Sequence, residues 1–274
     1  MFAISSVTKK AAALLSLFFL ISLSNAVLAQ TKPKRTDVGG AIPQSLLWVG
    51  HSFFYYNNSM HSHVANLIRA ADPQSRPRAV SVTISGSGID WHDMESYFRP
   101  NGIGRYSFVG DNEIVFNKPG RQFDAVIIAD CSQCPIHPQL KSVLHQFAKK
   151  QSDVVTANGA RPIFFMTWAY KDKPGMSAQL AEQYTIAGNA NDALVIPAGL
   201  AFAKAIAKRP DLEFYQPDKR HPTLIGTYLA ACTAYAAVFK KSPVGNTYTA
   251  GIDPAIAGFL QNTAQETVRE YFGY

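Results

Sequence analysis

The sequence is poor in cysteine, with only three residues of this type, which limits the chain to a single internal disulfide. The bridge either joins Cys131 to Cys134, which are close in sequence, or joins Cys232 to one of them. Cys232 lies in a stretch with helical character, where a cysteine is more often simply buried.

Long runs of positive charge are also absent. The formal net charge is +7, from 26 lysines and arginines against 19 acidic residues. Part of the excess lies at Lys32, Lys34 and Arg35, and the rest is scattered without a basic stripe interleaved with aromatic residues. This pattern argues against nucleic acid as a partner and supports only a general attraction to acidic polymers or anionic surfaces.

The apolar run at residues 11–23 is too short to cross a bilayer comfortably. It follows two lysines and precedes Val27-Leu28-Ala29, an arrangement typical of a secretory signal peptide. Gln30 follows the expected cleavage point, and the absence of a cysteine there argues against a lipoprotein. We therefore predict a signal peptide at residues 1–29, export to the bacterial periplasm or the medium, and no stable membrane anchor after cleavage.

Internal repeats, low-complexity segments and dividing linkers are absent as well. After an extended leader at residues 30–44, residues 45–274 are expected to form one domain with a substantial core. Strand-like and helix-like segments alternate, which predicts an α/β fold with a parallel sheet covered on both faces. The expected strands are residues 46–49, 79–84, 123–129, 161–168 and 194–197, and the expected helices are 60–71, 138–157, 177–190 and 224–235.

Residues 89–122 lack a clean hydrophobic period. They predict no more than a short helix at 91–98 and a hairpin at 106–116. Long irregular connections in compact domains are often lids or binding loops, and this one is expected to overhang the strand ends.

Ser52 stands out because of its position after the first expected strand. Residues 46–49 end at Gly50, and a helix-compatible stretch begins at Met60, so Ser52 is expected in the turn between strand and helix. In an open parallel sheet this turn lies at the carboxyl ends of the strands, where ligands bind. That is a suitable place for a nucleophile, although a serine in a turn is also a common capping residue.

A second polar cluster, Asp218-Lys219-Arg220-His221-Pro222, precedes the last expected helix. An aspartate three residues before a histidine in one loop can hold one ring nitrogen while the other points outward. Since a serine hydroxyl needs a base to take its proton, Ser52, His221 and Asp218 together provide nucleophile, base and orienting carboxylate.

Gly50-His51-Ser52, the glycine of Ser85-Gly86-Ser87-Gly88, and Asp218-x-x-His221-Pro222 resemble, in this order, the sequence blocks of the SGNH (GDSL-like) hydrolase superfamily. The resemblance implies a flavodoxin-like three-layer α/β/α fold, here with a five-stranded parallel sheet. It also implies a serine esterase that needs no cofactor and acts on small-molecule or glycan esters, often acetyl groups on carbohydrates. In that family Ser52 would be the nucleophile, His221 the general base and Asp218 its orienter.

The tetrahedral intermediate of such a reaction needs hydrogen-bond donors aimed at its oxyanion. The backbone N–H groups of Ser52 and Gly86 are candidates, because a glycine lets the backbone approach a substrate closely. The third donor departs from the family pattern. Where the usual block has G-x-N-D, this chain reads Ala129-Asp130-Cys131-Ser132-Gln133-Cys134, which leaves Ser132 or Gln133 as the replacement.

Four further side chains are candidates for substrate binding. His51 replaces the residue usual after the first glycine of the family and is expected either to contact substrate or to lie on the surface. Trp91, His92 and Trp168 fall near strand ends and are expected either to form aromatic walls for a sugar ring or to pack in the core.

No metal site is predicted. His61 and His63 lie on an expected helix with their side chains about 200° apart around its axis, so the two rings do not converge on one ion. No acidic residue has a spacing suited to join either of them.

Other functions fit parts of the sequence. The Cys131-x-x-Cys134 motif is typical of a periplasmic thiol redox protein, but the chain length and the position after the third strand argue against that class. The altered third block is compatible with a non-catalytic carbohydrate-binding protein on the same fold. An α/β-hydrolase elbow is disfavoured, because Phe54 replaces the second glycine of G-x-S-x-G. The oligomeric state is left open.

Overall fold

A computed structural model of the chain describes residues 31–100, 102–104, 106–116 and 121–274. The predicted signal peptide at residues 1–29 lies outside the described residues. Within the described ranges, no helix is both long and apolar enough to cross a membrane.

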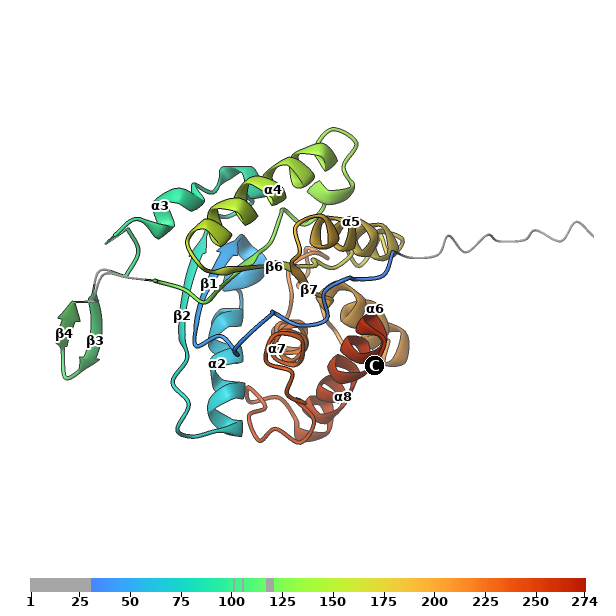
Figure 1. The fold of residues 1–274 in the computed structure, drawn as a ribbon. Helices are drawn as coiled ribbons and strands as arrows, with labels where there is room; N and C mark the ends of the chain where they lie inside the picture. Colours follow the sequence, from blue (N-terminus) through green and yellow to red (C-terminus); the bar gives the residue numbers. More distant parts are fainter. Residues whose placement is uncertain (1–30, 101, 105, 117–120) are drawn as a thin grey trace, which may run out of the picture. The chain divides into compact units, whose positions relative to one another are not determined.

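The centre of the domain is a five-stranded sheet in the order β2-β1-β5-β6-β7, with every neighbouring pair parallel (Figure 1). This confirms the predicted five-stranded parallel sheet. The strands are β1 (Ser45–Gly50), β2 (Arg78–Thr83), β5 (Ala125–Ile128), β6 (Arg161–Phe165) and β7 (Leu194–Ile196).

Both faces of the sheet are buried, which explains why β1 is a continuous apolar run. Leu46 and Trp48 point into one core, while Leu47 and Val49 point into the core on the opposite face. All four side chains are at most 1% exposed.

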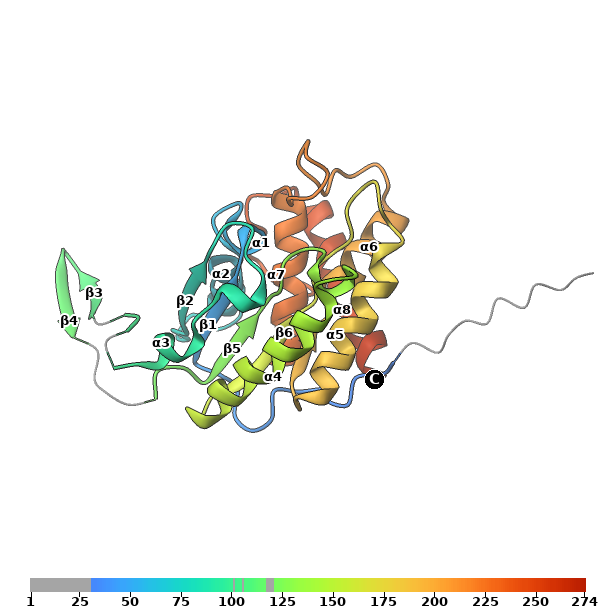
Figure 2. The same ribbon diagram turned by 90° about the horizontal axis from the view of Figure 1, so that it is seen from above.

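Helices cover the two faces and complete the predicted three layers (Figures 1 and 2). One face packs against α2 (Met60–Ala71), α6 (Ala198–Lys208), α7 (Leu224–Phe239) and α8 (Pro254–Phe272). The other face packs against α3 (Met94–Phe98), α4 (Lys141–Ala157) and α5 (Met176–Ala190).

The helix α7 is buried along nearly its whole length, from Gly226 to Phe239. It is rich in alanine and apolar on all sides, as a helix enclosed by other elements must be. Its amino end is fixed by Thr223, whose side-chain oxygen accepts a hydrogen bond from the N–H of Gly226 at 3.4 Å. The loop that carries Asp218 and His221 is therefore attached to a rigid helix.

The long connection between β2 and β5 contains the predicted short helix and hairpin. It begins with the 3₁₀ helix η1 (Ile89–Trp91) and α3, and continues into β3 (Tyr106–Gly110) and β4 (Glu113–Phe116). Asp111 and Asn112 join the two strands with positive φ angles of 38° and 67°. Short hairpin turns of this kind favour such residues.

Residues 31–44 form no helix and only approach β1 at their end. They run along α5, where the backbone N–H of Thr31 donates to Glu182 at 3.0 Å and that of Lys34 donates to Asn189 at 2.7 Å. Asn189 in turn donates to the carbonyl oxygen of Lys32.

Candidate active site

Ser52 follows β1 directly, as the sequence predicts, but it begins a short helix rather than lying in an open turn. This helix, α1 (Ser52–Tyr55), starts two residues after the strand, and Ser52 is 5% exposed. Gly50 ends the strand where neighbouring side chains leave little room. A Cβ atom at Gly50 would lie 3.0 Å from the ring of Phe54 and 3.2 Å from the Cβ of Ala129, so the chain packs too closely for a side chain there.

The structure brings Ser52, His221 and Asp218 together. The Nε2 atom of His221 lies 2.8 Å from the Oγ of Ser52, and its Nδ1 lies 2.5 Å from the Oδ2 of Asp218. Ser52 and His221 are 169 positions apart in sequence, whereas Asp218 and His221 belong to one loop. The chain of hydrogen bonds has the order that a nucleophile, base and orienting carboxylate require.

The carboxylate of Asp218 is held by the loop itself. Its Oδ1 accepts the backbone N–H groups of Arg220 at 2.9 Å and His221 at 3.0 Å. Burial acts to raise the pKa of Asp218, but the hydrogen bonds from the His221 ring and these two N–H groups outweigh it and lower the pKa to about 2. Asp218 is therefore an anion at neutral pH, although its side chain is 44% exposed.

Aromatic rings fix the plane of the histidine. Tyr56 stacks on the ring of His221 with centroids 4.3 Å apart and an interplanar angle of 11°, and Phe53 meets it edge-on at 5.8 Å. Both rings come from the segment that carries Ser52. The sequence pattern gives Tyr56 no role, because only the folded chain places it beside His221.

Asn57 joins the two halves of the site. Its side-chain amide donates to the carbonyl oxygen of Pro222 at 2.9 Å and to the hydroxyl of Thr227 at 2.8 Å. Asn57 does not cap the helix that follows, because the N-cap of α2 is Ser59, which makes no side-chain capping bond. Asn57 instead reaches across to the loop of His221.

The candidate oxyanion donors lie in three different loops. Gly86 has a φ of 72°, and no atom lies within 4 Å of the place a Cβ would occupy. Its N–H donates to no protein acceptor in the described part of the chain. Ser132 instead shares a 2.7 Å hydrogen bond with the hydroxyl of Tyr170, and Gln133 is exposed. Within the described residues, no hydrogen bond joins Ser132 or Gln133 to Ser52.

Three of the expected substrate contacts are core residues. Trp168 is fully buried between Phe53 and Phe202, with both ring centroids 4.2 Å away, and its indole N–H donates to the carbonyl oxygen of Arg220. It supports the histidine loop from below rather than forming a wall for a sugar. His92 is 4% exposed and bonds to Ser87 and Tyr97.

His51 is neither on the surface nor open to substrate, because its side chain is 3% exposed. Its Nε2 lies 2.9 Å from the carbonyl oxygen of Asp130, and its Nδ1 accepts the N–H of Phe53 at 3.5 Å. Burial lowers the pKa of His51 to about 4, so the ring is neutral at neutral pH. Its hydrogen bond to Asp130 connects the loop after β1 to the loop after β5. Trp91, in contrast, is 60% exposed.

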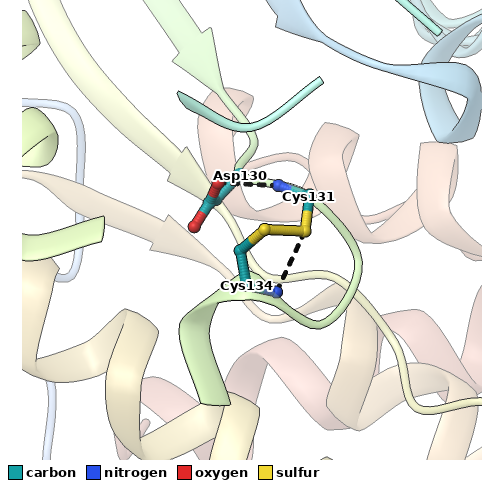
Figure 3. A group of neighbouring side chains, drawn as sticks. All are labelled: Asp130, Cys131 and Cys134. Atoms are coloured by element: carbon teal, nitrogen blue, oxygen red, sulfur yellow. Dashed lines mark hydrogen bonds between the residues drawn. A yellow bond between two sulfur atoms is a disulfide. The ribbon is translucent and has the colours of Figure 1, made fainter. Parts of the chain in front are cut away.

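The cysteine alternatives are resolved in favour of the local pair. Cys131 and Cys134 form a disulfide, with their Cα atoms 5.2 Å apart, and Cys232 is free and buried. Burial raises the pKa of Cys232 to about 12. In Figure 3 the disulfide lies beside the carboxyl of Asp130.

Asp130, Cys131 and Cys134 form the single group in the described ranges whose side chains are close enough to share a metal ion. Because both sulfurs are joined to each other, neither is the thiolate that metal binding requires. His61 and His63 do not form such a group, and the ring of His63 bonds instead to Tyr248 and to the carbonyl oxygen of Asn57.

No family model and no curated protein matches the sequence. Solved structures do match over most of the chain. A DUF4886 family protein from Bacteroides uniformis shares 18% identity, covers 81% of this chain and 93% of its own, and superposes with a TM-score of 0.54. A candidate SGNH hydrolase from Slackia heliotrinireducens shares 21% identity, with 70% and 97% covered and a TM-score of 0.53.

A candidate GDSL-like lipase from Parabacteroides merdae shares 12% identity, with 72% and 96% covered and a TM-score of 0.53. At such identities the likeness establishes the fold. The chain therefore has the three-layer fold of the SGNH (GDSL-like) hydrolases, as its sequence blocks indicate.

Proposed function

We propose that this protein is a serine esterase that hydrolyses carboxylic esters through an acyl-enzyme. The observation that carries the proposal is the 2.8 Å distance between His221 Nε2 and Ser52 Oγ, with Asp218 bonded to the other ring nitrogen. A buried serine, a histidine and an anionic aspartate in this order form a proton path that a merely structural serine does not need.

The geometry assigns each group a step. Asp218, as an anion, accepts the Nδ1–H of His221 and so leaves the lone pair of Nε2 directed at the Ser52 hydroxyl. Ser52 Oγ attacks the ester carbonyl while His221 takes its proton, and the imidazolium then gives that proton to the departing alcohol. His221 next activates a water that cleaves the acyl-Ser52 ester and restores the free serine.

Negative charge on the tetrahedral intermediate requires nearby donors, and we assign this role to the backbone N–H groups of Ser52 and Gly86. The N–H of Gly86, which donates to no acceptor among the described residues, and the open space at its Cβ position support this assignment. The loss of one such donor typically costs on the order of 3 kcal/mol in the transition state.

The substrate class that we favour is acetyl esters of a carbohydrate or cell-wall glycan. The side chains of His221 and Asp218 are 24% and 44% exposed, so a bulky alcohol part can extend into solvent while the acyl group enters the site. The exposed ring of Trp91 is the remaining candidate for a sugar-binding surface. The predicted signal peptide supports an extracytoplasmic glycan as the target.

A panel of p-nitrophenyl esters of increasing acyl length, assayed beside acetylated polysaccharides, tests this function. We expect the acetyl ester to be cleaved fastest, acetate to be released from at least one polysaccharide, and Ser52→Ala to lower kcat by roughly four orders of magnitude. Binding of a polysaccharide with no release of acetate and no cleavage of any ester would instead identify a non-catalytic binding protein.

A further inference from the structure

The disulfide loop between β5 and α4 has chemistry that the ester mechanism does not use. A carboxylate oxygen of Asp130 and the sulfurs of Cys131 and Cys134 all lie within 4.8 Å of one another (Figure 3). We propose that this cluster is a thiol–disulfide exchange site, in which the Cys131–Cys134 bridge exchanges electrons with an external dithiol and Asp130 carries a proton to and from Cys134.

The two sulfurs are not equivalent. Cys134 is 8% exposed, whereas Cys131 is partly exposed and can be reached from solvent. The backbone N–H of Cys134 donates to the sulfur of Cys131 at 3.1 Å, which stabilises negative charge on that sulfur when the bridge is open. We therefore expect external thiols to form and break their mixed disulfide with Cys131. Cys134 is the buried sulfur that leaves when the bridge opens and attacks when it closes.

Asp130 is unusual because one of its oxygens is buried without a partner. Its side chain is 2% exposed, and its Oδ1 accepts the backbone N–H groups of Ile89 and Cys131 at 2.9 and 2.8 Å. Its Oδ2 has no hydrogen-bond partner in the described part of the chain. A buried, unsatisfied carboxyl oxygen is costly and calls for an explanation, which a proton-transfer role beside Cys134 supplies.

The surroundings of Asp130 suit this role. Burial and the nearby charge of Asp90 raise the pKa of Asp130, and the two hydrogen bonds from backbone N–H groups lower it. The net result is a pKa of about 6, so Asp130 can accept or give a proton near neutral pH. The other titratable groups against it are His51, whose neutral ring bonds to its carbonyl oxygen, and Tyr184, whose hydroxyl accepts its backbone N–H.

The reaction is balanced with a dithiol as the reductant. One thiol of the dithiol releases its proton to solvent and attacks Cys131 Sγ as a thiolate. The Cys131–Cys134 bond breaks, its electron pair leaves on Cys134 Sγ, which takes the proton of Asp130, and Asp130 regains a proton from solvent. The second thiol of the dithiol then attacks the dithiol sulfur of the mixed disulfide, and its proton passes to the departing Cys131 thiolate. The dithiol loses two electrons and two protons and becomes a disulfide, and the bridge becomes two thiols.

This exchange does not depend on the proposed esterase activity, because it uses none of Ser52, His221 or Asp218. The variant Ser52→Ala is therefore a matched control that should lose ester cleavage and keep the redox couple. Failure of one activity is in this way distinguished from failure of the other.

A redox titration is the first test. The full chain carrying Cys232→Ser is equilibrated in buffers with different ratios of reduced to oxidised dithiothreitol, quenched in acid, alkylated and weighed by mass spectrometry. We expect two thiols to appear together and reversibly while circular dichroism stays native. A bridge that opens only when the protein unfolds would overturn the proposal.

Single-cysteine variants and Asp130→Asn test the assigned roles. In the same background we expect Cys134→Ser to form a glutathione adduct at Cys131 at least about tenfold faster than Cys131→Ser forms one at Cys134, because only Cys131 is accessible. Equal rates would contradict the proposed asymmetry.

In reduced Asp130→Asn treated with oxidised glutathione, we expect the Cys131 adduct to accumulate, because closure by Cys134 is slowed about 100-fold and shifts to higher pH. Asparagine keeps the Oδ1 acceptor for both N–H groups, so the fold should persist. Closure at the wild-type rate with the wild-type pH profile would refute the role of Asp130.

Discussion

Asp218 shows how a single loop sets the charge of a site residue. Three donors, the ring of His221 and two backbone N–H groups, overcome the burial that alone would raise its pKa. Since the pKa falls from 3.8 to about 2, the orienting charge is complete above about pH 4 and is lost only as the pH falls through about 2.

We therefore expect the pH profile of kcat/KM to show no ionisation step from Asp218 above about pH 3. Ester hydrolysis measured from pH 3 to pH 9 at constant ionic strength checks this. Two ionisations on the acid limb would show that Asp218 titrates within the working range.

The variant Asp218→Asn should keep the packing of the loop and lose the anion that fixes the tautomer of His221. We expect kcat to fall by roughly 10³- to 10⁴-fold with little change in KM. Steady-state kinetics on the best p-nitrophenyl ester, with circular dichroism as the folding control, measure this. A loss below tenfold would mean that His221 is oriented by its ring contacts alone.

Asn57 offers a residue-level test with a close control. It adopts φ 52° and bonds to Pro222 and Thr227, while its exposed neighbour Asn58 adopts φ 68°. Alanine is strained at both positions, but only Asn57→Ala also removes the link between the two loops. We expect Asn57→Ala to cost about 1–3 kcal/mol more in unfolding free energy than Asn58→Ala and to lower kcat further. Urea unfolding and kinetics that are the same for both variants would rule out this link.

At the scale of elements, the five strands of the sheet and the helices α2, α4, α5 and α7 follow from local pattern, whereas α6 and α8 are not among the helices expected from the sequence. The short apolar run of β1 and the β-branched run of β2 predict strands from their length and residue types alone, without tertiary information. The burial of Trp168 and His51 could not be predicted in this way. Each side chain has a polar end and is enclosed by segments distant in sequence. Whether it contacts substrate or packs in the core therefore depends on tertiary packing.

The start of α7 gives a prediction about packing. A Cβ at Gly226 would lie 2.7 Å from the backbone oxygen of Phe214 and 2.9 Å from the ring of Phe202, directly under the histidine loop. At Gly258, in α8, no atom lies within 4 Å of the same position. We expect Gly226→Ala to destabilise the fold by about 1–3 kcal/mol.

Gly258→Ala is the matched control and should stabilise the fold by about 0.5–1 kcal/mol, because it only restrains the unfolded chain and improves helix propensity. Thermal or urea unfolding of both variants measures the difference. A change in unfolding free energy of the same sign in both variants would show that close packing does not exclude a side chain at Gly226.

At the scale of the whole molecule, the site is assembled where three loops meet at the carboxyl ends of the parallel strands, a place that the predicted topology already specifies. Ser52 and Gly86 follow β1 and β2, and His221 arrives from the loop before α7. The sequence blocks identify these residues. For the third oxyanion donor they leave Ser132 or Gln133 open. In the structure the loop after β5 holds the disulfide, and Ser132 shares a hydrogen bond with Tyr170.

Asp130 also makes a contribution to stability that depends on pH. Its pKa is raised from 3.8 to about 6, so the folded state increasingly disfavours its ionised form and loses stability as the pH rises from about 4 to about 6. Asp130→Asn removes this loss. We expect the unfolding free energy of the variant, relative to wild type, to increase by about 3 kcal/mol between pH 4 and pH 7.5. A difference between the two proteins that does not change with pH would show that Asp130 is ionised in the fold without cost.

The central claim is that His221 draws a proton from Ser52, and labelling by a fluorophosphonate measures this most directly. We expect one adduct per chain, mapped to Ser52 by peptide mass spectrometry, with the labelling rate at least about 100-fold lower in His221→Ala and no adduct in Ser52→Ala. Absence of any adduct on the folded wild-type protein, or labelling that is as fast in His221→Ala, would contradict the account.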